Sequence, residues 1–293
     1  MAHIAERGLV HYLGMTLGSS VTCCPDPRLL GEHLVTTRPT AFGGVPRVWE
    51  KLKTGLELAC GGPPPLERAE EARAMVGLDR VERTIGAAAA VPVEVLEFFA
   101  AIGITILELW GMSETTAVAT INRPGAHRFG TVGQALAGVE LRLEDDGELL
   151  VRGDIVMTGY RNLPQQTAKA LTPDGWLRTG DIATIDDDGY VTIVDRKKEL
   201  IINAAGKNMS PANIESQLKV ASPLIGQAYA HGDGRPYNVA LIALEPDARA
   251  AFGGEVDAEV ARGVAAANAK LARVEQIKRW HIVEGDCCRA ATS

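Results

Sequence analysis

The sequence predicts an α/β protein, and three observations support that fold class. Residues 82–116 place a helical pattern between two strand-like runs, which is typical of a parallel sheet covered by helices. From residue 130, short strands separated by turns take over. After Asp195 helical and strand-like patterns mix again, so the chain changes character twice and predicts more than one folding unit.

The first 110 residues carry the elements of the parallel sheet. Residues 1–60 alternate helical and strand-like runs, and RPTAFGGVPRVWEKL predicts a short buried strand, a turn and a helix beginning near Pro46. Residues 60–77 predict a Gly/Pro loop and a charged helix. A small-residue loop at Gly86–Ala90 leads into an amphipathic helix that Gly103 ends, and ITILELW then predicts a buried strand.

The remainder of the chain is predicted as hairpins followed by mixed structure. Asp146-Gly147 and Asp188-Gly189 lie between alternating apolar and polar runs, which is a strong hairpin signal. Beyond residue 195 we expect helices near 211–220 and 247–279 and a strand at 237–245. Ser210 precedes Pro211 and is a plausible N-cap for the first of these helices.

Composition and charge exclude several classes of protein. A net charge of −7 over 293 residues, with only short basic clusters, argues against a nucleic-acid-binding protein. Residues 85–110 are the most apolar stretch, but Pro92 and three glutamates interrupt them, so no transmembrane segment is expected. The start has no secretory pattern, and the five cysteines show no ligand or disulfide spacing. A cytoplasmic setting is the expectation.

The segment LWGMSETT is the first candidate for chemistry. It comes at the end of a predicted buried strand, and it offers an aromatic ring, a glycine that permits close backbone approach, the hydroxyls of Ser113 and Thr115 and the carboxylate of Glu114. Such groups at the carboxyl end of a parallel strand suit a nucleotide and magnesium. The residues alone favour a strand-to-helix turn with a serine cap, in which Glu114 is an ordinary first-turn acid.

Two further stretches carry candidate residues. Asp181 lies inside an otherwise apolar run, so it is expected to be partly buried and to need partners; ribose hydroxyls or nearby backbone amides would both serve. Residues 195–199 are five consecutive charges between two apolar runs. Arg196 would reach a sugar or phosphate there, and the alternative is a solvated turn. Phosphate-loop, dinucleotide, zinc-protease and serine-hydrolase motifs are absent, and the six histidines are scattered.

Taken in order, these stretches resemble the long-chain fatty acid–CoA ligases (acyl-CoA synthetases) of the adenylate-forming, AMP-binding superfamily. IGAAAAVPVEVLEFFAAIGITILELWGMSETT is similar to the family's adenine loop and its Y-G-x-T-E signature, with Trp110 in place of Tyr and Ser113 in place of Thr. PTAFGGVPRVWEKL resembles the segment before that loop. Three later stretches resemble the motifs that follow it: GELLVRGDIVMTGYRNLPQQT, GWLRTGDIATIDDDGYVTIVDRKKELI and AAGKNMSPANIE. The resemblance covers essentially residues 1–286.

The resemblance implies a fold and a domain division. Residues 1–197 are expected to be the rear part of a large adenylate-forming α/β domain, with a β-rich subdomain at about 130–195. Residues 198–293 are expected to be a truncated small α+β domain. Lys198 matches the hinge between the two, so the charged run would be a domain junction.

The resemblance also implies site residues and cofactors. ATP, Mg²⁺ and the co-substrate CoA would be bound, and the adenine nucleotide would be contacted by Gly86, Ala87, Ala88, Glu108, Trp110, Gly111, Met112, Ser113, Asp181 and Arg196. Trp110 would lie against the base and Ser113 would contact the α-phosphate. Asp181 would bind the ribose with Arg196 beside it, and Glu114 would hold the magnesium ion.

Two family motifs are missing from the sequence. The phosphate loop with its lysine is expected upstream of MAHIAER, where His3 matches the histidine of the next motif. The final lysine motif is expected after VEQIKRWHIVEGD, but CCRAATS stands there and has no family character. No catalytic residue is therefore assigned, and the chain is expected to be a C-terminal portion of a ligase.

Two classes of function follow from this. The first is a ligase that joins a fatty acid to CoA with ATP through an acyl-adenylate, active only with a separately encoded N-terminal portion. The second is a non-catalytic remnant or partner-binding subunit that retains the fold. An adenylation module of peptide synthesis is a third, weaker reading, because VPRVWEKL and RPYNVALIALEPDA resemble acyl-CoA ligases more closely.

Overall fold

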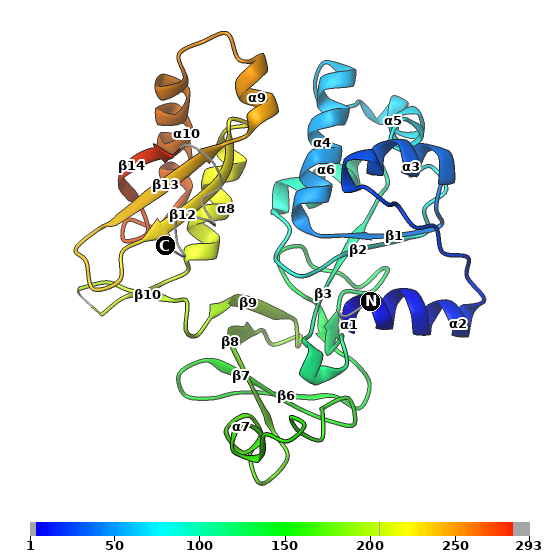
Figure 1. Cartoon of the computed structure of the whole chain (residues 1–293), viewed down its shortest axis with the longest axis vertical. Coiled ribbons are helices and arrows are strands. Elements are labelled where there is room, and N and C mark those ends of the chain that lie inside the picture. Colours follow the sequence, from blue (N-terminus) through cyan, green and yellow to red (C-terminus); the bar gives the residue numbers. More distant parts are fainter. Residues whose placement is uncertain (1–3, 205, 284–293) are drawn as a thin grey trace. The chain divides into compact units, whose positions relative to one another are not determined.

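A computed structural model describes residues 4–204 and 206–283 of the chain (Figure 1). The chain divides into two compact units. The first unit comprises Met1–Thr179 with Ala183–Ile193, and the second comprises Gly180–Ile182 with Val194–Ser293. His3 and the C-terminal residues CCRAATS lie outside the described residues.

The first unit begins with helices only. They are α1 (Ile4–Glu6), the π-helix η1 (Arg7–Tyr12), α2 (Leu13–Leu17), the 3₁₀-helix η2 (Pro27–Leu29) and α3 (Leu30–Thr37). The expected alternation over residues 1–60 is confirmed only in part: the strand Ala41–Gly44 lies between α3 and the helix Pro46–Cys60, whereas the described residues before Ala41 contain no strand. A short apolar run can form either a helix or a strand, and the runs in this segment form helical turns.

A five-stranded sheet forms the centre of the first unit. Its strands, in spatial and chain order, are β1 (Ala41–Gly44), β2 (Arg83–Gly86), β3 (Ile106–Trp110), β4 (Thr120–Ile121) and β5 (Gln134–Ala135). The first three strands are parallel, and the last two are antiparallel to their neighbours. The predicted parallel α/β pattern is confirmed.

Helices supply the core of this unit. They are α4 (Pro46–Cys60), the 3₁₀-helix η3 (Leu66–Arg68), α5 (Ala69–Met75) and α6 (Val93–Ala101). Trp49 of α4 and Phe99 of α6 are fully buried, and their rings meet edge to face with centroids 5.1 Å apart. Strand β1 was expected to be buried, but it is the edge strand and its burial alternates between exposed and intermediate residues.

A second sheet holds the hairpins. Its order is β6 (Glu140–Leu143), β7 (Glu148–Arg152), β8 (Leu177–Ile185) and β9 (Val191–Arg196), with α7 (Pro164–Ala170) between β7 and β8 in the chain. Gly147 and Gly189 have φ values of 85° and 82°, a conformation that favours glycine in tight turns. Both predicted hairpin turns are confirmed.

The second unit has its own α+β core. It contains the hairpin of β10 (Ile201–Ile202) and β11 (Asn208–Met209), then α8 (Pro211–Ala221), β12 (Ile225–His231), β13 (Asn238–Leu244), α9 (Pro246–Ala251), α10 (Val256–Lys270) and β14 (Ile277–Val283). Helices α8 and α10 contribute Ile214, Leu218, Val260 and Val264 to one apolar cluster with the three-stranded sheet β12-β13-β14.

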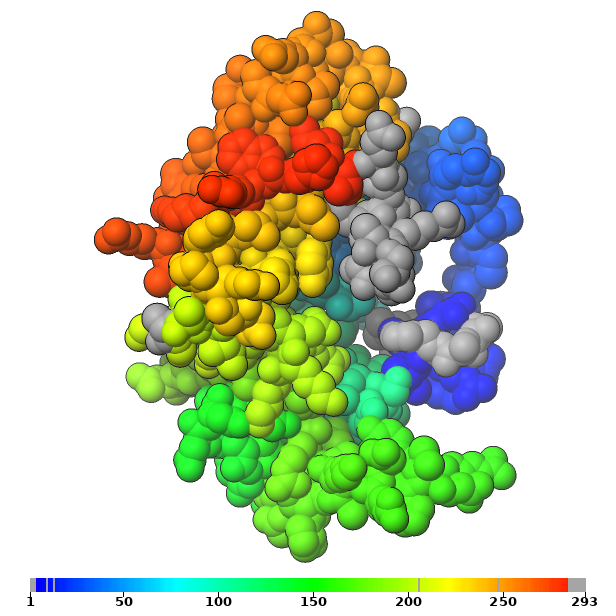
Figure 2. All heavy atoms as spheres, turned by 60° about the vertical axis from the view of Figure 1, so that its left-hand side comes forward, coloured from blue at the N-terminus to red at the C-terminus, as the bar shows by residue number. Residues whose placement is uncertain are grey.

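The predicted helical region 247–279 is confirmed as far as Lys270, where it holds the two helices α9 and α10, and the prediction is wrong for its last residues. Gly253 and Gly254 separate α9 from α10, because glycine disfavours a helix interior. The last residues of that stretch form β14, which pairs in parallel with β13 and lies beside it on the surface in Figure 2. The predicted α8 and β13 are confirmed, whereas β12 was not predicted.

Among the described residues, no helix is both long and apolar enough to span a membrane. Cys23, Cys24 and Cys60 are free thiols.

Candidate functional site

The carboxyl ends of the three parallel strands form one edge of the first unit's sheet. Gly44 of β1 is in register with Gly86 of β2, which is in register with Glu108 of β3. The segments that leave these strands therefore start from the same edge. In open α/β sheets this edge is where ligands bind.

The loop after β2 is tightly constrained at its start. Gly86 is buried, and a Cβ at this position would lie 2.8 Å from Val91 Cγ2, so no larger side chain fits without displacement. The Ala87 amide donates to the Gly44 carbonyl at 3.4 Å, which joins the loop to β1. Ala88 is exposed with φ of 74°, a left-handed conformation that alanine rarely adopts.

Glu108 supports this loop from inside the protein. Its side chain is 4% exposed, and Oε1 accepts a hydrogen bond from the Val91 amide at 3.0 Å. Burial raises the pKa of Glu108 to about 7, although the Val91 amide opposes the shift. The structure thus gives Glu108 a bracing contact with the loop, and its predicted contact with a nucleotide stays a prediction.

Trp110 and Gly111 end β3. Trp110 is half-buried and packs on an apolar cluster that contains Leu149 and Val191. A Cβ on Gly111 would lie 2.2 Å from the Ala117 carbonyl oxygen, so the expected close backbone approach at this glycine is confirmed. The chain folds back on itself here, which makes the turn that follows compact.

The turn itself is the 3₁₀-helix η4 (Ser113–Thr115). Ser113 is exposed, and Thr115 is fully buried with its hydroxyl accepting from the Met112 amide at 2.9 Å. The stabilising hydroxyl is therefore that of Thr115, so the alternative of a serine-capped helix start is wrong. Ser113 remains available to a ligand, while its contact with a phosphate stays a prediction.

Glu114 is half-buried and has a specific partner. Its Oε1 accepts a hydrogen bond from the Tyr160 hydroxyl at 2.7 Å, and within residues 4–204 and 206–283 nothing donates to Oε2. No cluster of three or more His, Cys, Asp or Glu side chains suited to a metal occurs in the same described residues. One carboxylate with a free oxygen fits Mg²⁺, which usually binds one or two carboxylates together with substrate phosphates.

Tyr160 is a site residue that was not predicted from the sequence. Burial, together with the hydrogen bond to Glu114, raises the pKa of Tyr160 to about 12, so the phenol remains a donor at neutral pH. The residue lies in GYRNLPQQT, a stretch used for the resemblance but not examined for contacts. The sequence signal that could have identified it is a tyrosine directly after a glycine in this predicted loop.

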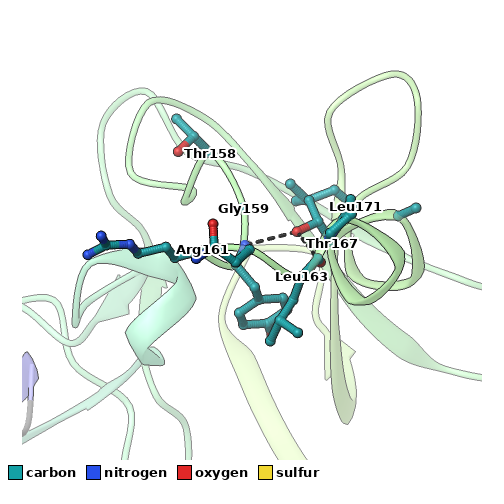
Figure 3. Close-up of a pocket in the computed structure, with 10 residues that line it drawn as sticks. Thr158, Gly159, Arg161, Leu163, Thr167 and Leu171 are labelled. Atoms are coloured by element: carbon teal, nitrogen blue, oxygen red, sulfur yellow. Dashed lines mark hydrogen bonds between the residues drawn. The ribbon is translucent and has the colours of Figure 1, made fainter.

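The same loop lines a pocket of about 540 Å³ bounded by residues 158–164 and three residues of α7 and its end, Thr167, Ala168 and Leu171 (Figure 3). Thr167 accepts a hydrogen bond from the Tyr160 amide at 2.9 Å and donates to the Leu163 carbonyl at 3.0 Å. The loop is therefore fastened to α7 by one threonine hydroxyl.

Asp181 and Arg196 belong to the second unit. Asp181 is 3% exposed, and its Oδ1 lies 2.8 Å from Nε of the exposed Arg196. The Lys197 amide donates to the Gly180 carbonyl at 2.8 Å, which fixes the backbone next to this pair. Burial of Asp181 and the position of Arg196 beside it are as expected, whereas ribose binding stays a prediction.

Asp195 has a structural role that the sequence analysis missed. It is 7% exposed, and Oδ2 accepts from the Ser210 hydroxyl at 2.6 Å and from the Ala212 amide at 3.2 Å. Ser210 in turn accepts from the Asn213 amide at 3.0 Å, so the predicted N-cap is confirmed. One of the five consecutive charges is thus a buried helix cap and not part of a solvated turn.

Lys198 lies in the exposed turn Lys197–Glu199 between β9 and β10. Its four predecessors, Val194–Lys197, group with the second unit. The hinge role of Lys198 and the domain boundary at that residue stay predictions.

Comparison with known protein families matches both parts of the chain. The profile described as AMP-binding enzyme matches residues 1–161, and that of the AMP-binding enzyme C-terminal domain matches residues 198–291.

Similar curated proteins cover almost all of the chain. The putative fatty-acid–CoA ligase fadD11 of Mycobacterium tuberculosis is 43% identical over 336 aligned residues, which include 96% of this chain and 59% of the relative. The long-chain-fatty-acid–CoA ligase ACSBG2 of Gallus gallus is 31% identical, with 84% of this chain and 38% of the relative covered. The chain thus spans less than two thirds of the length of these relatives.

Solved structures have the same fold. ATP-bound MatB from Rhodopseudomonas palustris superposes with a TM-score of 0.72 at 26% identity, covering 96% of this chain and 54% of that one. The anthranilate CoA ligase AuaEII in complex with anthranoyl-AMP gives a TM-score of 0.75 at 22% identity, covering 96% and 53%, which shows the fold alone. Since the first family profile matches more than half of the residues, the chain belongs to the AMP-binding enzyme family.

Proposed function

We propose that this chain contributes the adenine-nucleotide part of a fatty-acid–CoA ligase. One observation carries the proposal: three parallel strands end at a common edge, and the loop after β2 and the turn after β3 leave from that edge. A nucleotide bound in an α/β sheet occupies this place.

The substrates are inferred from the relatives. Proteins 43% and 31% identical to this chain are named fatty-acid–CoA ligases, and a structure at 26% identity is titled as ATP-bound. We therefore propose ATP, a fatty acid and CoA as the molecules handled by the complete enzyme, with a separately encoded N-terminal portion as the partner of this chain.

The proposed reaction has two steps. A fatty-acid carboxylate oxygen forms a bond to the α-phosphorus of ATP, and the bond to pyrophosphate breaks. The CoA thiolate then attacks the acyl carbon, and the carbon–oxygen bond to AMP breaks. Activation is needed because a carboxylate is negatively charged and has no good leaving group.

The residues at the sheet edge have distinct proposed roles. The loop Gly86–Ala88 would line the adenine and ribose, and Trp110 would lie against the base. The exposed hydroxyl of Ser113 would donate to an α-phosphate oxygen. Glu114 would hold Mg²⁺ through Oε2, and the ion would offset negative charge on the phosphate oxygens when bound.

For the second unit, Asp181 is proposed to accept hydrogen bonds from ribose hydroxyls. The ion pair with Arg196 supports this role, because it gives the buried carboxylate a partner of opposite charge and orients it. Lys198 is proposed as the pivot between the two reaction steps, a role that its exposed turn would allow.

The test is fatty-acid-dependent exchange of labelled pyrophosphate into ATP. The purified chain is assayed alone and mixed with the N-terminal portion of a relative such as fadD11. Exchange in the mixture that disappears with Glu114→Ala supports the proposal. Folded protein that gives no exchange in either assay would leave the non-catalytic reading in its place.

A further inference from the structure

We propose that Tyr160 is a positioning residue that fixes the carboxylate of Glu114, and that Thr167 holds Tyr160 in place. The inference rests on the proposed function of Glu114 as the magnesium ligand. It assigns a role to two residues of the segment GYRNLPQQT, Tyr160 and Thr167, and gives a physical reason for their presence there.

The central contact joins two distant parts of the chain. The Tyr160 hydroxyl donates to Glu114 Oε1 at 2.7 Å, although the residues are 46 positions apart. A phenol donating to a carboxylate is a strong hydrogen bond at this length. With Oε1 held, the carboxylate has one orientation, and Oε2 is the oxygen left for a cation.

The backbone around Glu114 is strained and is held by the same segment. Thr116 and Ala117 have φ values of 55° and 84°, and such conformations persist only where the surroundings enforce them. The Met157 amide donates to the Glu114 carbonyl at 2.8 Å, and the Thr116 hydroxyl donates to the Ile155 carbonyl at 2.8 Å. The segment thus fixes both the backbone and the side chain of Glu114.

Thr167 fixes the tyrosine in turn. Its hydroxyl accepts from the Tyr160 amide at 2.9 Å, and Figure 3 shows this bond reaching from α7 to the loop beside Gly159. A Cβ on Gly159 would lie 2.7 Å from Thr167 Cγ2, and its φ is 145°, so glycine is required for this approach. The chain of contacts runs from Thr167 to Tyr160 to Glu114.

This arrangement matters for a metal held by a single carboxylate. Each other ligand of the ion would come from the nucleotide or water, so the protein controls the ion only through the direction of Oε2. Partners that orient a metal ligand typically contribute about 10- to 100-fold to metal affinity. Loss of the Tyr160 hydroxyl should therefore weaken Mg²⁺-dependent binding specifically.

The experiment is calorimetric titration of the full chain with ATP, once with Mg²⁺ and once with EDTA. The ratio of the two dissociation constants is the gain due to the metal. In Tyr160→Phe this gain should fall about tenfold, while binding in EDTA stays within about twofold of wild type. Tyr237→Phe, at a 39% exposed tyrosine of the second unit, is the matched control and should keep the wild-type gain.

The role of the Thr167 hydroxyl is tested with two conservative substitutions. Thr167→Val keeps the shape but removes the hydroxyl, and it should lower the metal gain in the same direction as Tyr160→Phe. Thr167→Ser keeps the hydroxyl and should restore most of the gain. Equal gains for valine and serine would remove Thr167 from the proposal.

Two outcomes overturn the role of Tyr160. An unchanged gain in Tyr160→Phe shows that the hydroxyl does not act on the metal, and equal weakening with Mg²⁺ and EDTA shows a general structural role. Wild-type chain that binds ATP equally in both buffers contradicts the proposed role of Glu114 itself. Only the last result counts against the proposed function.

The contact is also testable without any nucleotide. Unfolding by urea of wild type, Tyr160→Phe, Glu114→Ala and the double variant gives a double-mutant cycle. The hydrogen bond predicts a coupling of about tenfold in the unfolding equilibrium constant. Additivity within about twofold would show that the two side chains do not interact, and would overturn the proposal.

Discussion

At the scale of single residues, two glutamates near the same strand end are placed for different tasks. Glu108 is 4% exposed and braces the Val91 amide, whereas Glu114 is half-buried with one oxygen held by Tyr160. Only six positions separate them, yet burial raises the pKa of Glu108 to about 7, whereas Glu114 is only half-buried. Environment, and not residue type, assigns the roles.

The pKa of Glu108 predicts a pH dependence of stability. Because burial raises this pKa from 4.5 to about 7, the protonated form stabilises the fold below pH 4.5, and that contribution is lost as the pH rises through 7. Glu108→Gln removes the titration. The difference in free energy of unfolding, wild type minus variant, should fall by about 3 kcal/mol between these limits.

Urea unfolding of both proteins at pH 5, 6, 7 and 8 measures this difference. Acid effects from other groups cancel in the subtraction, because both proteins share them. A difference that stays constant across this range would show that Glu108 has an ordinary pKa in the folded protein.

Replacement of two glycines by alanine should change the free energy of unfolding in opposite directions. Gly111→Ala places a Cβ 2.2 Å from the Ala117 carbonyl oxygen, and such overpacking should cost about 1–3 kcal/mol. Gly55 lies within α4 with nothing near its Cβ position, so Gly55→Ala should stabilise by about 0.5–1 kcal/mol. Thermal melting of both variants checks this, and the same sign for the two shifts would contradict the backbone arrangement at Gly111.

At the scale of elements, the sequence was sufficient wherever local signals agreed with the fold. The turns at Asp146-Gly147 and Asp188-Gly189, the helix beginning at Pro46 and the cap at Ser210 all rest on local chemistry, and each is present. Strands β12 and β14 were missed or assigned to a helix, because their residues become strands only by pairing with β13.

The candidate site shows the same difference between properties of single residues and contacts between distant residues. Gly111 was predicted to allow close approach because that property belongs to one residue, whereas the contacts of Glu114 with Tyr160 and of Asp195 with Ser210 join residues 46 and 15 positions apart. Spacing in the sequence cannot reveal such pairs when no period or motif links them.

Helix α8 depends on a cap that comes from outside its own sequence. Asp195→Ala removes the acceptor for the Ser210 hydroxyl and the Ala212 amide, and it should lower the free energy of unfolding by about 1–2 kcal/mol. Asp187→Ala, at an exposed aspartate, should change it by less than about 0.5 kcal/mol. Urea unfolding compares the two, and equal effects would show that Asp195 does not stabilise α8.

At the scale of the whole molecule, the chain holds two units with separate cores and a match to one family over both. The first unit's core is built around Trp49 and Phe99, and the second around Ile214 and Val260. The order of motifs in the sequence was enough to predict the family, because five stretches in a fixed order are far more specific than any one of them. The roles of the site residues require a ligand to test them.

The alignment with fadD11 extends over 336 positions and is longer than this chain of 293 residues. The relative therefore carries residues inside the matched region that have no counterpart here. The edge formed by β1, β2 and β3 is nevertheless present in this chain.

The most direct test of the account is calorimetric binding of a fatty-acyl adenosine sulfamate, a stable analogue of the acyl-adenylate. We predict that wild type binds the analogue and that Trp110→Phe binds it with near-wild-type affinity. Trp110→Leu should lose about tenfold in affinity, because stacking on a base is typically worth about 1–3 kcal/mol. Trp280→Leu, at a 39% exposed tryptophan of β14, should bind as wild type does. Folded wild-type chain that does not bind the analogue, or equal affinities for the phenylalanine and leucine variants, would contradict an adenine site at the edge of this sheet.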